Sequence, residues 1–332
     1  MKKIKYIIII TFFILKSSYV YSDDNFDVWK INFKKYALKQ GISTQTLNRI
    51  IDKSKFLPDV IKYDRYQPEF YEDTKTYISK RATNKKIIIG NKIYKNNFKK
   101  IDKISKKFNI DKSLLLSLMG IETNFGNYLG KMDIISSLAT LSFDKRRSEF
   151  FTSELITLLK LIDNNIVNSD NLFGSWAGAF GNFQFMPSTI KNYAIDSDKD
   201  GKINLKETED SFASAANYIN KLGWKKNNPC FYKVELKDNI PSKYLNTSAK
   251  KIKNKKKYKF FKKYLVNNEN IKINDNLIVG IITPDKEIVE NSKILEPAYL
   301  IFDNYELILK WNRSLRFALA VCTLKERFRN EL

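Results

Sequence analysis

The chain has 332 residues, of which 43% are hydrophobic and 29% are charged, so we expect a globular protein of two or three structural units and not a disordered one. It contains no histidine, which excludes Ser-His-Asp and Cys-His catalysis and every zinc site that needs imidazole. Acid–base chemistry near neutral pH must then use carboxylates, lysines or tyrosines. The net charge of +23 implies an anionic partner but does not identify it.

Residues 1–22 have the pattern of a secretory signal peptide. Lysines at positions 2, 3 and 5 precede the apolar stretch 6–15, and Val20 and Ser22 occupy the −3 and −1 positions of a cut after Ser22. The apolar stretch is short for a membrane span, which needs about 20 residues, although an uncleaved N-terminal membrane anchor remains an alternative. No cysteine follows it that would carry a lipid. We therefore expect a periplasmic or secreted protein.

Helical periodicity predicts an N-terminal helical domain over residues 23–100 and a helical core over residues 101–227. Within the first domain, Ser43 or Thr44 is the expected cap of a helix. Within the core, Asp111 is the expected cap of a helix that carries an apolar stripe.

The helix after Asp111 has an apolar face that ends in a carboxylate: Leu115, Leu118, Met119 and Glu122. A glutamate at a helix end usually faces solvent and has no special role. This one continues the apolar stripe, and glycines at 126 and 130 open a loop directly after it. Poor solvation would raise its pKa and keep it protonated near neutral pH, as a general acid requires. Glu122 is therefore our candidate acid.

Residues 174–187 could supply a cleft beside this acid, because glycines at 174, 178 and 181 allow close approach of backbone or ligand. Aromatic rings alternate there with hydroxyl and amide groups, which suits a sugar: Trp176, Phe180, Phe183 and Phe185 with Ser175, Asn182 and Gln184. The alternative is that each aromatic residue belongs to the core, and for any single one this is the simpler interpretation. Pro187 suits the first turn of a following helix.

Residues 196–207 match the twelve-residue calcium loop. The expected ligands are the side chains at loop positions 1, 3, 5, 9 and 12 and one backbone carbonyl at position 7: Asp196, Asp198, Asp200, Asn204 and Glu207, with Lys202 giving the carbonyl. Four carboxylates this close repel one another unless a cation lies between them. We expect a structural Ca²⁺ and no organic cofactor; the alternative is a degenerate loop that holds sodium or nothing.

The last third of the chain changes character. Residues 228–302 are rich in β-formers, in "CFYKVEL", "NLIVGIITP" and "AYLIFDNYELIL", and predict a small β-rich domain. Residues 303–332 predict a C-terminal helix that returns to the core, so the fold class is mainly α, of the α+β kind. The lysine-rich run 250–263 is either a solvated surface or a polyanion patch. Cys230 and Cys322 are either a disulfide or two buried thiols.

Three stretches in order resemble the lytic murein transglycosylase B family (glycoside hydrolase family 103): "GIETNFGNYLGKMDIISSLATLSFDKRRSEFF", "GSWAGAFGNFQFMPSTIKNYAIDSDKDGKINL" with "SAANYINKLGW", and "YELILKWNRSLRFALAV". The resemblance implies a lysozyme-like helical core, an additional helical domain and a small β-rich domain. It also implies cleavage of the β-1,4 bond between N-acetylmuramic acid and N-acetylglucosamine in peptidoglycan, leaving a 1,6-anhydro end. The family's single catalytic glutamate matches Glu122, which would act first as acid and then as base. A second acid at Asp133, Asp144 or Glu154 remains open.

Other positions carry roles only through this resemblance. Ser175 and Gln184 match cleft residues that contact sugar, Asn312 matches an asparagine near the N-acetyl group, and Tyr77 matches a cleft tyrosine. Trp311 and Phe317 depart from the family, which has tyrosines there, so one sugar contact is lost or replaced by stacking.

The implied partners are peptidoglycan glycan strands and the cell-wall synthesis machinery. No nucleic-acid partner is expected for an exported protein, and the oligomeric state is open. The alternative function is a calcium-stabilised peptidoglycan-binding protein without catalysis.

Overall fold

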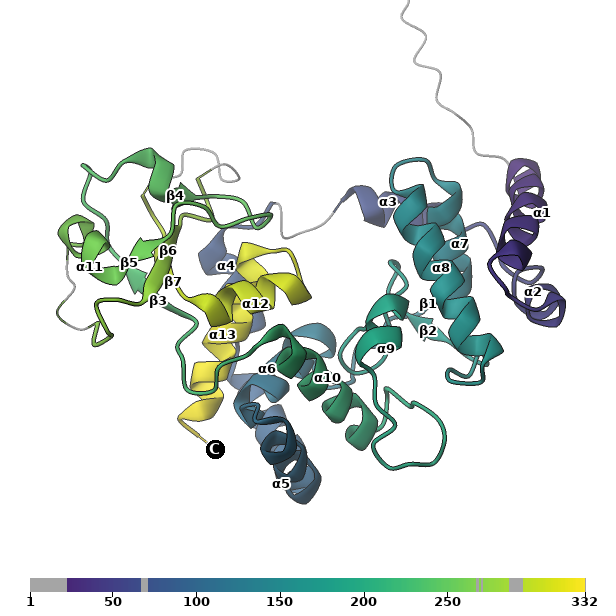
Figure 1. Cartoon of the computed structure of the whole chain (residues 1–332), viewed down its shortest axis with the longest axis horizontal. Coiled ribbons are helices and arrows are strands. Elements are labelled where there is room, and N and C mark those ends of the chain that lie inside the picture. Colours follow the sequence, from purple (N-terminus) through teal and green to yellow (C-terminus); the bar gives the residue numbers. More distant parts are fainter. Residues whose placement is uncertain (1–22, 67–70, 267–268, 270, 287–294, 332) are drawn as a thin grey trace, which may run out of the picture.

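A computed structural model describes residues 23–66, 71–266, 269, 271–286 and 295–331, so the predicted signal peptide lies outside the described residues. The described part is mainly helical, with a small sheet (Figure 1). Among its helices, none is both long enough and apolar enough to cross a membrane.

The N-terminal helices pack onto a helical pair further along the chain, α7 and α8 (Figure 1). Their bounds are α1 Asp23–Lys39, α2 Thr44–Ile50, α3 Pro58–Arg65, α7 Ile134–Phe143 and α8 Ser148–Asp163. Ser43 caps α2 as expected, since its hydroxyl accepts a hydrogen bond from the Thr46 amide at 3.1 Å. The same hydroxyl donates to Asp163 at 2.5 Å, which ties α2 to the end of α8.

The second group of helices surrounds α6, the helix that carries Glu122. Its members are α4 Thr74–Arg81, α5 Asn84–Phe108, α6 Lys112–Thr123, α9 Pro187–Tyr193, α10 Thr208–Leu222, α12 Asp303–Trp311 and α13 Leu315–Arg329. α6 packs against α5, α10 and α13. The predicted domain boundary between residues 100 and 101 lies within α5, which continues to Phe108 with one kink at Asn97, and the division into domains stays a prediction.

The β-rich unit is a small sheet with strand order β3-β7-β6-β4, to which β5 adds by pairing with β6. The strands are β3 Phe231–Val234, β4 Leu245–Asn246, β5 Lys256–Lys257, β6 Ile278–Ile282 and β7 Ala298–Ile301, and α11 Tyr258–Phe261 follows β5. All pairs are antiparallel except β4 with β6. Alternate residues of β6 and β7, such as Val279, Ile281 and Leu300, fill a core separate from that of the helices.

The prediction for "AYLIFDNYELIL" was half wrong. Only Ala298–Ile301 is a strand, and Asp303–Trp311 forms α12, which buries Tyr305, Ile308 and Leu309 at helical spacing. The predicted single C-terminal helix is therefore two helices, α12 and α13.

Two contacts join the sheet to the helices. Cys230, just before β3, and Cys322 of α13 form a disulfide with Cα atoms 6.1 Å apart, which decides between the alternatives left open by the sequence. Asp285, which follows β6, accepts from the backbone amide and hydroxyl of Thr74 and pairs with Arg316 of α13 at 2.6 Å. All three of these polar side chains are buried.

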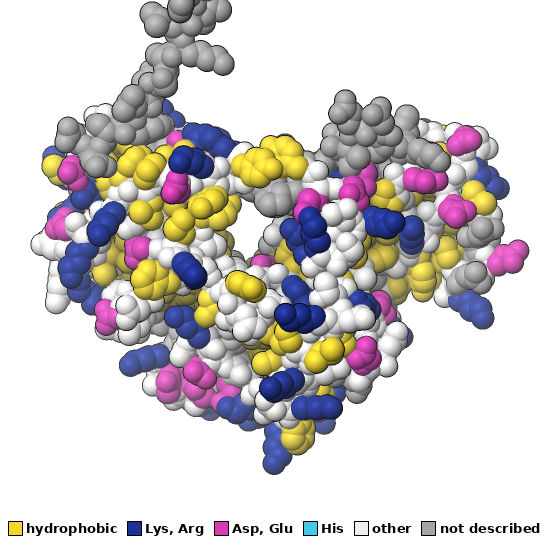
Figure 2. Space-filling view, turned by 180° about the vertical axis from the view of Figure 1, so that it is seen from behind, with side chains coloured by type: hydrophobic (Ala, Val, Ile, Leu, Met, Phe, Trp, Pro, Cys, Tyr) yellow, Lys and Arg dark blue, Asp and Glu magenta, His cyan; other side chains and the backbone are white. Residues whose placement is uncertain are grey.

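The elements form two lobes with an opening between them, which the space-filling view shows near the middle of the molecule (Figure 2). α6 lies below α12 and beside α10 (Figure 1). A short pair, β1 Met132–Asp133 with β2 Phe173–Gly174, follows α6 in the other lobe. The chain therefore passes from one lobe to the other directly after the last turn of α6, which contains Glu122.

Candidate active site

α6 ends in a sharply turned loop directly after Glu122. Asn124, Phe125 and Gly126 have φ angles of 48°, 60° and 83°. Thr123 holds this turn, since its hydroxyl donates to the Asn182 carbonyl at 2.8 Å and accepts from the Gly126 amide at 3.0 Å. The left-handed backbone stops the helix one residue after Glu122, so the carboxylate lies at the helix end, as predicted.

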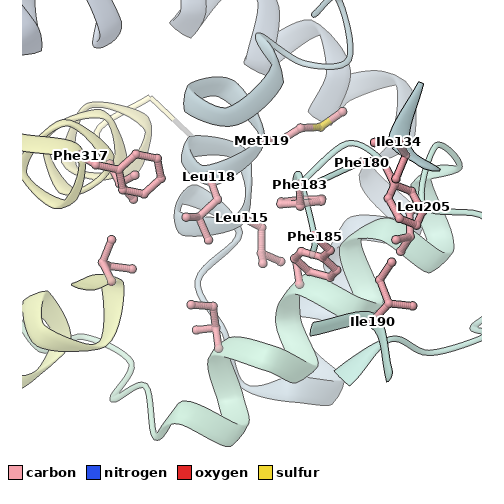
Figure 3. Close-up of a cluster of buried hydrophobic side chains, with 14 of the residues drawn as sticks. Leu115, Leu118, Met119, Ile134, Phe180, Phe183, Phe185, Ile190, Leu205 and Phe317 are labelled. Carbon is pink, nitrogen blue, oxygen red and sulfur yellow. The ribbon is translucent and has the colours of Figure 1, made fainter. Parts of the chain in front are cut away.

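The apolar stripe of α6 is buried as the sequence predicted, and Glu122 at its end is half-buried. Figure 3 shows Leu115 and Leu118 between Phe317 of α13 and Phe185. Phe317 is only 4% exposed and belongs to this core. The expected raised pKa of Glu122 stays a prediction.

The other end of α6 differs from the prediction in one respect. Asp111 occupies the cap position, but its side chain makes no capping hydrogen bond. Its carboxylate instead accepts a hydrogen bond from the indole Nε1 of Trp224 at 3.0 Å.

Glu122 has a hydrogen-bond partner that the sequence pattern did not reveal. The indole Nε1 of Trp311, the last residue of α12, donates to Glu122 Oε1 at 2.8 Å. A hydrogen bond donated to a carboxylate stabilises its ionised form. Trp311, noted in the sequence only as a departure from the family, therefore touches the candidate acid.

A stack of aromatic rings supports Trp311. Its ring lies parallel to that of Tyr218, with centroids 5.1 Å apart, and Tyr218 stacks in turn on Tyr193 at 4.3 Å. Phe185 packs edge-on against both rings, with its centroid 5.3 Å from that of Trp311 and 6.1 Å from that of Tyr218. Burial raises the pKa of Tyr218 to about 12, so this phenol stays neutral at physiological pH.

A half-buried cation also acts on the site. Lys86, near the start of α5, donates a hydrogen bond to the Gly120 carbonyl on α6. The pKa of Lys86 is lowered to about 8, chiefly by desolvation and also by the charge of Arg81, while the charge of Glu122 acts to raise it. The sequence did not single out Lys86 among its many lysines, and the only available signal was its place beside the buried Ile87 and Gly90.

The glycine-rich segment brings the loop after α6 against β2. A Cβ at Gly130 would lie 2.0 Å from the Gly174 carbonyl oxygen, and Gly130 has a φ of +91°. One at Gly174 would lie 2.2 Å from the Ala179 carbonyl oxygen. The glycines therefore serve close backbone approach, as predicted.

Most of the aromatic residues in this segment are core residues. Phe180, Phe183 and Phe185 are 5%, 2% and 3% exposed, which confirms the simpler interpretation, whereas Trp176 is half-buried. Only Trp176 among these rings thus remains available for a sugar face.

Ser175 and Gln184 hold the segment in place. The Ser175 hydroxyl accepts from the Ala179 amide at 3.0 Å. The Gln184 side-chain nitrogen donates to the Gly181 and Leu129 carbonyls at 3.0 and 3.2 Å. Both side chains are half-buried, so their roles as sugar contacts stay predictions.

Asn312 directly follows Trp311 and is half-buried, and among the described residues no side-chain hydrogen bond engages its amide. Tyr77 of α4 is only 5% exposed and lies under the guanidinium of Arg81, 3.6 Å from the ring centroid. The roles of Asn312 and Tyr77 as sugar contacts stay predictions, and Tyr77 has little exposed surface for one.

The three other acids considered from the sequence have structural contacts. Asp133 accepts from the Ser136 amide at the start of α7, at 2.7 Å. Asp144 pairs with Arg65 at 2.9 Å. Glu154 accepts from the Ser188 amide and hydroxyl. Asp133 thus caps α7, whereas Asp144 and Glu154 each hold two segments together.

The predicted calcium loop gathers three carboxylates whose oxygens lie within 4.8 Å of one another: Asp196, Asp198 and Asp210. Asp210, in the first turn of α10, was not predicted. It is 1% exposed and accepts from the backbone amides of Ser197 and Asn204 at 2.7 and 2.8 Å. The Asp200 amide acts to lower the pKa of Asp198, but desolvation and the charges of Asp210 and Asp200 together raise it.

The remaining predicted ligands lie in the same loop. Asp200 Oδ1 accepts from the Lys202 amide at 2.8 Å, and Asn204 Oδ1 accepts from the Lys206 amide at 3.1 Å. Glu207 is the residue before α10, outside the cluster of three carboxylates. An all-oxygen donor set fits a hard cation such as Ca²⁺. The twelve-residue template ended at Glu207 and so did not reach Asp210.

A family model described as the transglycosylase SLT domain matches residues 25–326, which is nearly all of the described chain. The chain belongs to this family. It is 42% identical over 120 residues to the membrane-bound lytic murein transglycosylase B of Escherichia coli K12, a stretch that covers 36% of this chain and 33% of that relative's length. The resemblance expected from the three sequence motifs is thereby confirmed.

Solved structures of the family share the fold. SltB3 from Pseudomonas aeruginosa, in complex with NAG-anhNAM-pentapeptide, has a TM-score of 0.80 at 28% identity, over 92% of this chain and 79% of that one. E. coli lytic transglycosylase Slt35, in complex with calcium, has a TM-score of 0.74 at 25% identity, over 93% and 94% of the two chains. The predicted mainly helical, lysozyme-like fold with a small sheet is confirmed.

Proposed function

We propose that the chain is a murein lytic transglycosylase that cleaves the β-1,4 bond between N-acetylmuramic acid and N-acetylglucosamine and leaves a 1,6-anhydro end. The observation that carries this is the half-buried Glu122 at the end of α6, hydrogen-bonded to Trp311, in a chain of this family. SltB3 was solved with a NAG-NAM-pentapeptide, which supports the same substrate class here.

In the proposed mechanism one carboxyl group performs two proton transfers. Glu122 first protonates the leaving glycosidic oxygen and then accepts the proton of the muramic acid 6-hydroxyl as that oxygen attacks the same sugar. Ordinary glycosidases need a second carboxylate as nucleophile or base. A tethered hydroxyl replaces that group and the water, with the entropic advantage of an intramolecular attack. Asn312, next to Trp311, would contact the N-acetyl group; Ser175, Gln184 and Tyr77 would complete the binding surface.

The test is digestion of purified sacculi followed by mass measurement of the released muropeptides. We expect 1,6-anhydro products, and no products from Glu122→Gln. Glu149→Gln, an exposed glutamate in the first turn of α8, is the matched control and should behave like wild type. Products heavier by one water would show a hydrolase instead. Equal binding to sacculi by wild type and Glu122→Gln without any release would favour the non-catalytic binding protein.

A calcium ion is the second part of the proposal. Asp196, Asp198 and Asp210 would hold it, with Asp200, Asn204, Glu207 and the Lys202 carbonyl as the further expected ligands. The ion would neutralise the crowded carboxylates and fix the loop between α9 and α10, and α10 carries Tyr218 of the aromatic stack. Slt35, solved with calcium, supports this.

We place the protein in the periplasm or outside the cell. A disulfide between Cys230 and Cys322 suits an oxidising compartment. The positive net charge would draw the protein to the carboxylates of peptidoglycan, less strongly at high salt.

A further inference from the structure

We propose that Trp311 is a positioning residue for Glu122, and that its indole N–H assigns separate tasks to the two carboxyl oxygens. The catalytic consequence of this inference rests on the proposed function, whereas the contact itself can be tested without any activity.

The chemistry of the indole makes the contact one-directional. Indole Nε1–H is a donor only, so it can meet Glu122 Oε1 only as an acceptor. When Glu122 is protonated, its carbonyl oxygen is a better acceptor than its hydroxyl oxygen, so the bond to Trp311 favours the proton on the other oxygen, Oε2. Oε2 is then the atom that gives the proton to the leaving oxygen and later receives it from the 6-hydroxyl, while Oε1 stays bound to Trp311 throughout.

The surroundings of Trp311 fix the direction of the indole. Tyr218 stacks on one face, with an interplanar angle of 25°, and Phe185 and Phe183 present edges at 5.3 and 6.4 Å. The Tyr218 hydroxyl lies 3.3 Å from the Lys310 carbonyl and so ties α10 to the end of α12. Because these contacts already fix the ring, Trp311 loses little further side-chain entropy when it binds the Glu122 carboxylate.

The departures from the family fit this role. A tyrosine hydroxyl both donates and accepts, so it could take the proton-bearing oxygen as readily as the other one. Phe317, the second departure, is buried beside Leu118. It has no hydroxyl that could compete with Trp311 for a hydrogen bond to Glu122. The charges of Lys86 on α5 and Glu122 act on each other, and the charge of Arg81 on α4 acts on Lys86. The charge interaction favours the ionised carboxylate as a whole, whereas the Trp311 hydrogen bond is made to one oxygen.

The chain offers a matched control on the same helix. Trp224 donates its indole N–H to Asp111 at 3.0 Å, at the opposite end of α6 from Glu122. Trp224→Phe and Trp311→Phe each remove one indole–carboxylate hydrogen bond and keep an aromatic ring. A merely structural role predicts the same result for both variants.

The first measurement is the indole N–H region of a ¹⁵N–¹H spectrum of the full chain, in which each variant identifies the resonance it removes. We expect Glu122→Gln to shift the Trp311 resonance and leave that of Trp224 in place, and we expect the Trp311 resonance to follow pH as Glu122 titrates. A Trp311 resonance that responds to neither change overturns the contact, whether or not the protein is an enzyme.

The second measurement is steady-state kinetics on soluble uncrosslinked glycan strands. We expect Trp311→Phe to lower kcat about tenfold to a hundredfold with KM changed less than about twofold. The limb of the pH–rate profile set by Glu122 should move to higher pH, because the ionised form loses a donor. Trp311→Tyr should restore only part of kcat, because a tyrosine hydroxyl can donate to Glu122 but does not fix which oxygen carries the proton. Trp224→Phe should keep both kcat and the profile.

Two kinetic outcomes overturn the inference while leaving the proposed function intact. One is a Trp311→Phe variant with wild-type kcat and an unmoved profile. The other is a rise in KM alone, which would make Trp311 a substrate-binding surface. If wild type releases no anhydro product, the proposed function fails, and the spectrum still decides whether Trp311 holds Glu122.

Discussion

The disulfide between Cys230 and Cys322 should account for a large part of the free energy of unfolding. It joins residues 92 apart in sequence, and the loop-entropy relation gives about 4.6 kcal/mol at 25 °C for a loop of that length. Native bridges in smaller domains typically contribute about 2–5 kcal/mol. We therefore expect the double variant Cys230→Ala/Cys322→Ala to lose about 3–5 kcal/mol, since both positions are buried and alanine fills most of the cysteine volume.

Urea unfolding followed by circular dichroism measures this loss, with thiol titration to establish that wild type has no free cysteine. Dithiothreitol supplies the control, because it should bring wild type down to the stability of the variant and leave the variant, which has no cysteine, unaffected. A variant within about 1 kcal/mol of fully oxidised wild type would refute the reasoning.

Two other predictions concern the loop and the half-buried lysine. The melting temperature should be higher with calcium than with a chelator, and Asp210→Asn should remove more of this difference than Glu207→Gln. A larger loss for Glu207→Gln than for Asp210→Asn would contradict the cluster of three carboxylates. Lys86 has a pKa of about 8 in the fold against an ordinary 10.5, so between these pH values the unfolded chain binds more protons and stability rises with pH. In urea unfolding midpoints measured from pH 7.5 to 10, Lys86→Met should show a smaller rise of stability with pH than wild type. An unchanged slope would argue against the burial of Lys86 as the cause of the rise.

Local patterns predicted the parts of the fold that depend on neighbours in sequence. Ser43 caps α2 and Pro187 opens α9 because caps and first turns are decided within a few residues. Glu122 stands at the end of its apolar stripe for the same reason. Asp196 and Asp198, two of the three clustered carboxylates, were predicted from the spacing within the loop.

Contacts between distant residues could not be predicted in this way. Trp311 and Glu122 are 189 positions apart, so no periodicity connects them. The run before Trp311 was ambiguous because its apolar residues suit a strand as well as a helix. Asp210 was missed because it belongs to α10 and only folding brings it back to the loop.

The two indoles that meet the ends of α6 come from residues 224 and 311, and α13 covers its flank. A chain is synthesised from its N-terminus, so α6 emerges before these partners do. A nascent or truncated chain that stops before α12 has Glu122 without Trp311 and α6 without α13. For an enzyme of the proposed kind, such a chain lacks both the donor to its acid and a helix that packs on α6, so we expect it to have little activity on the cell wall.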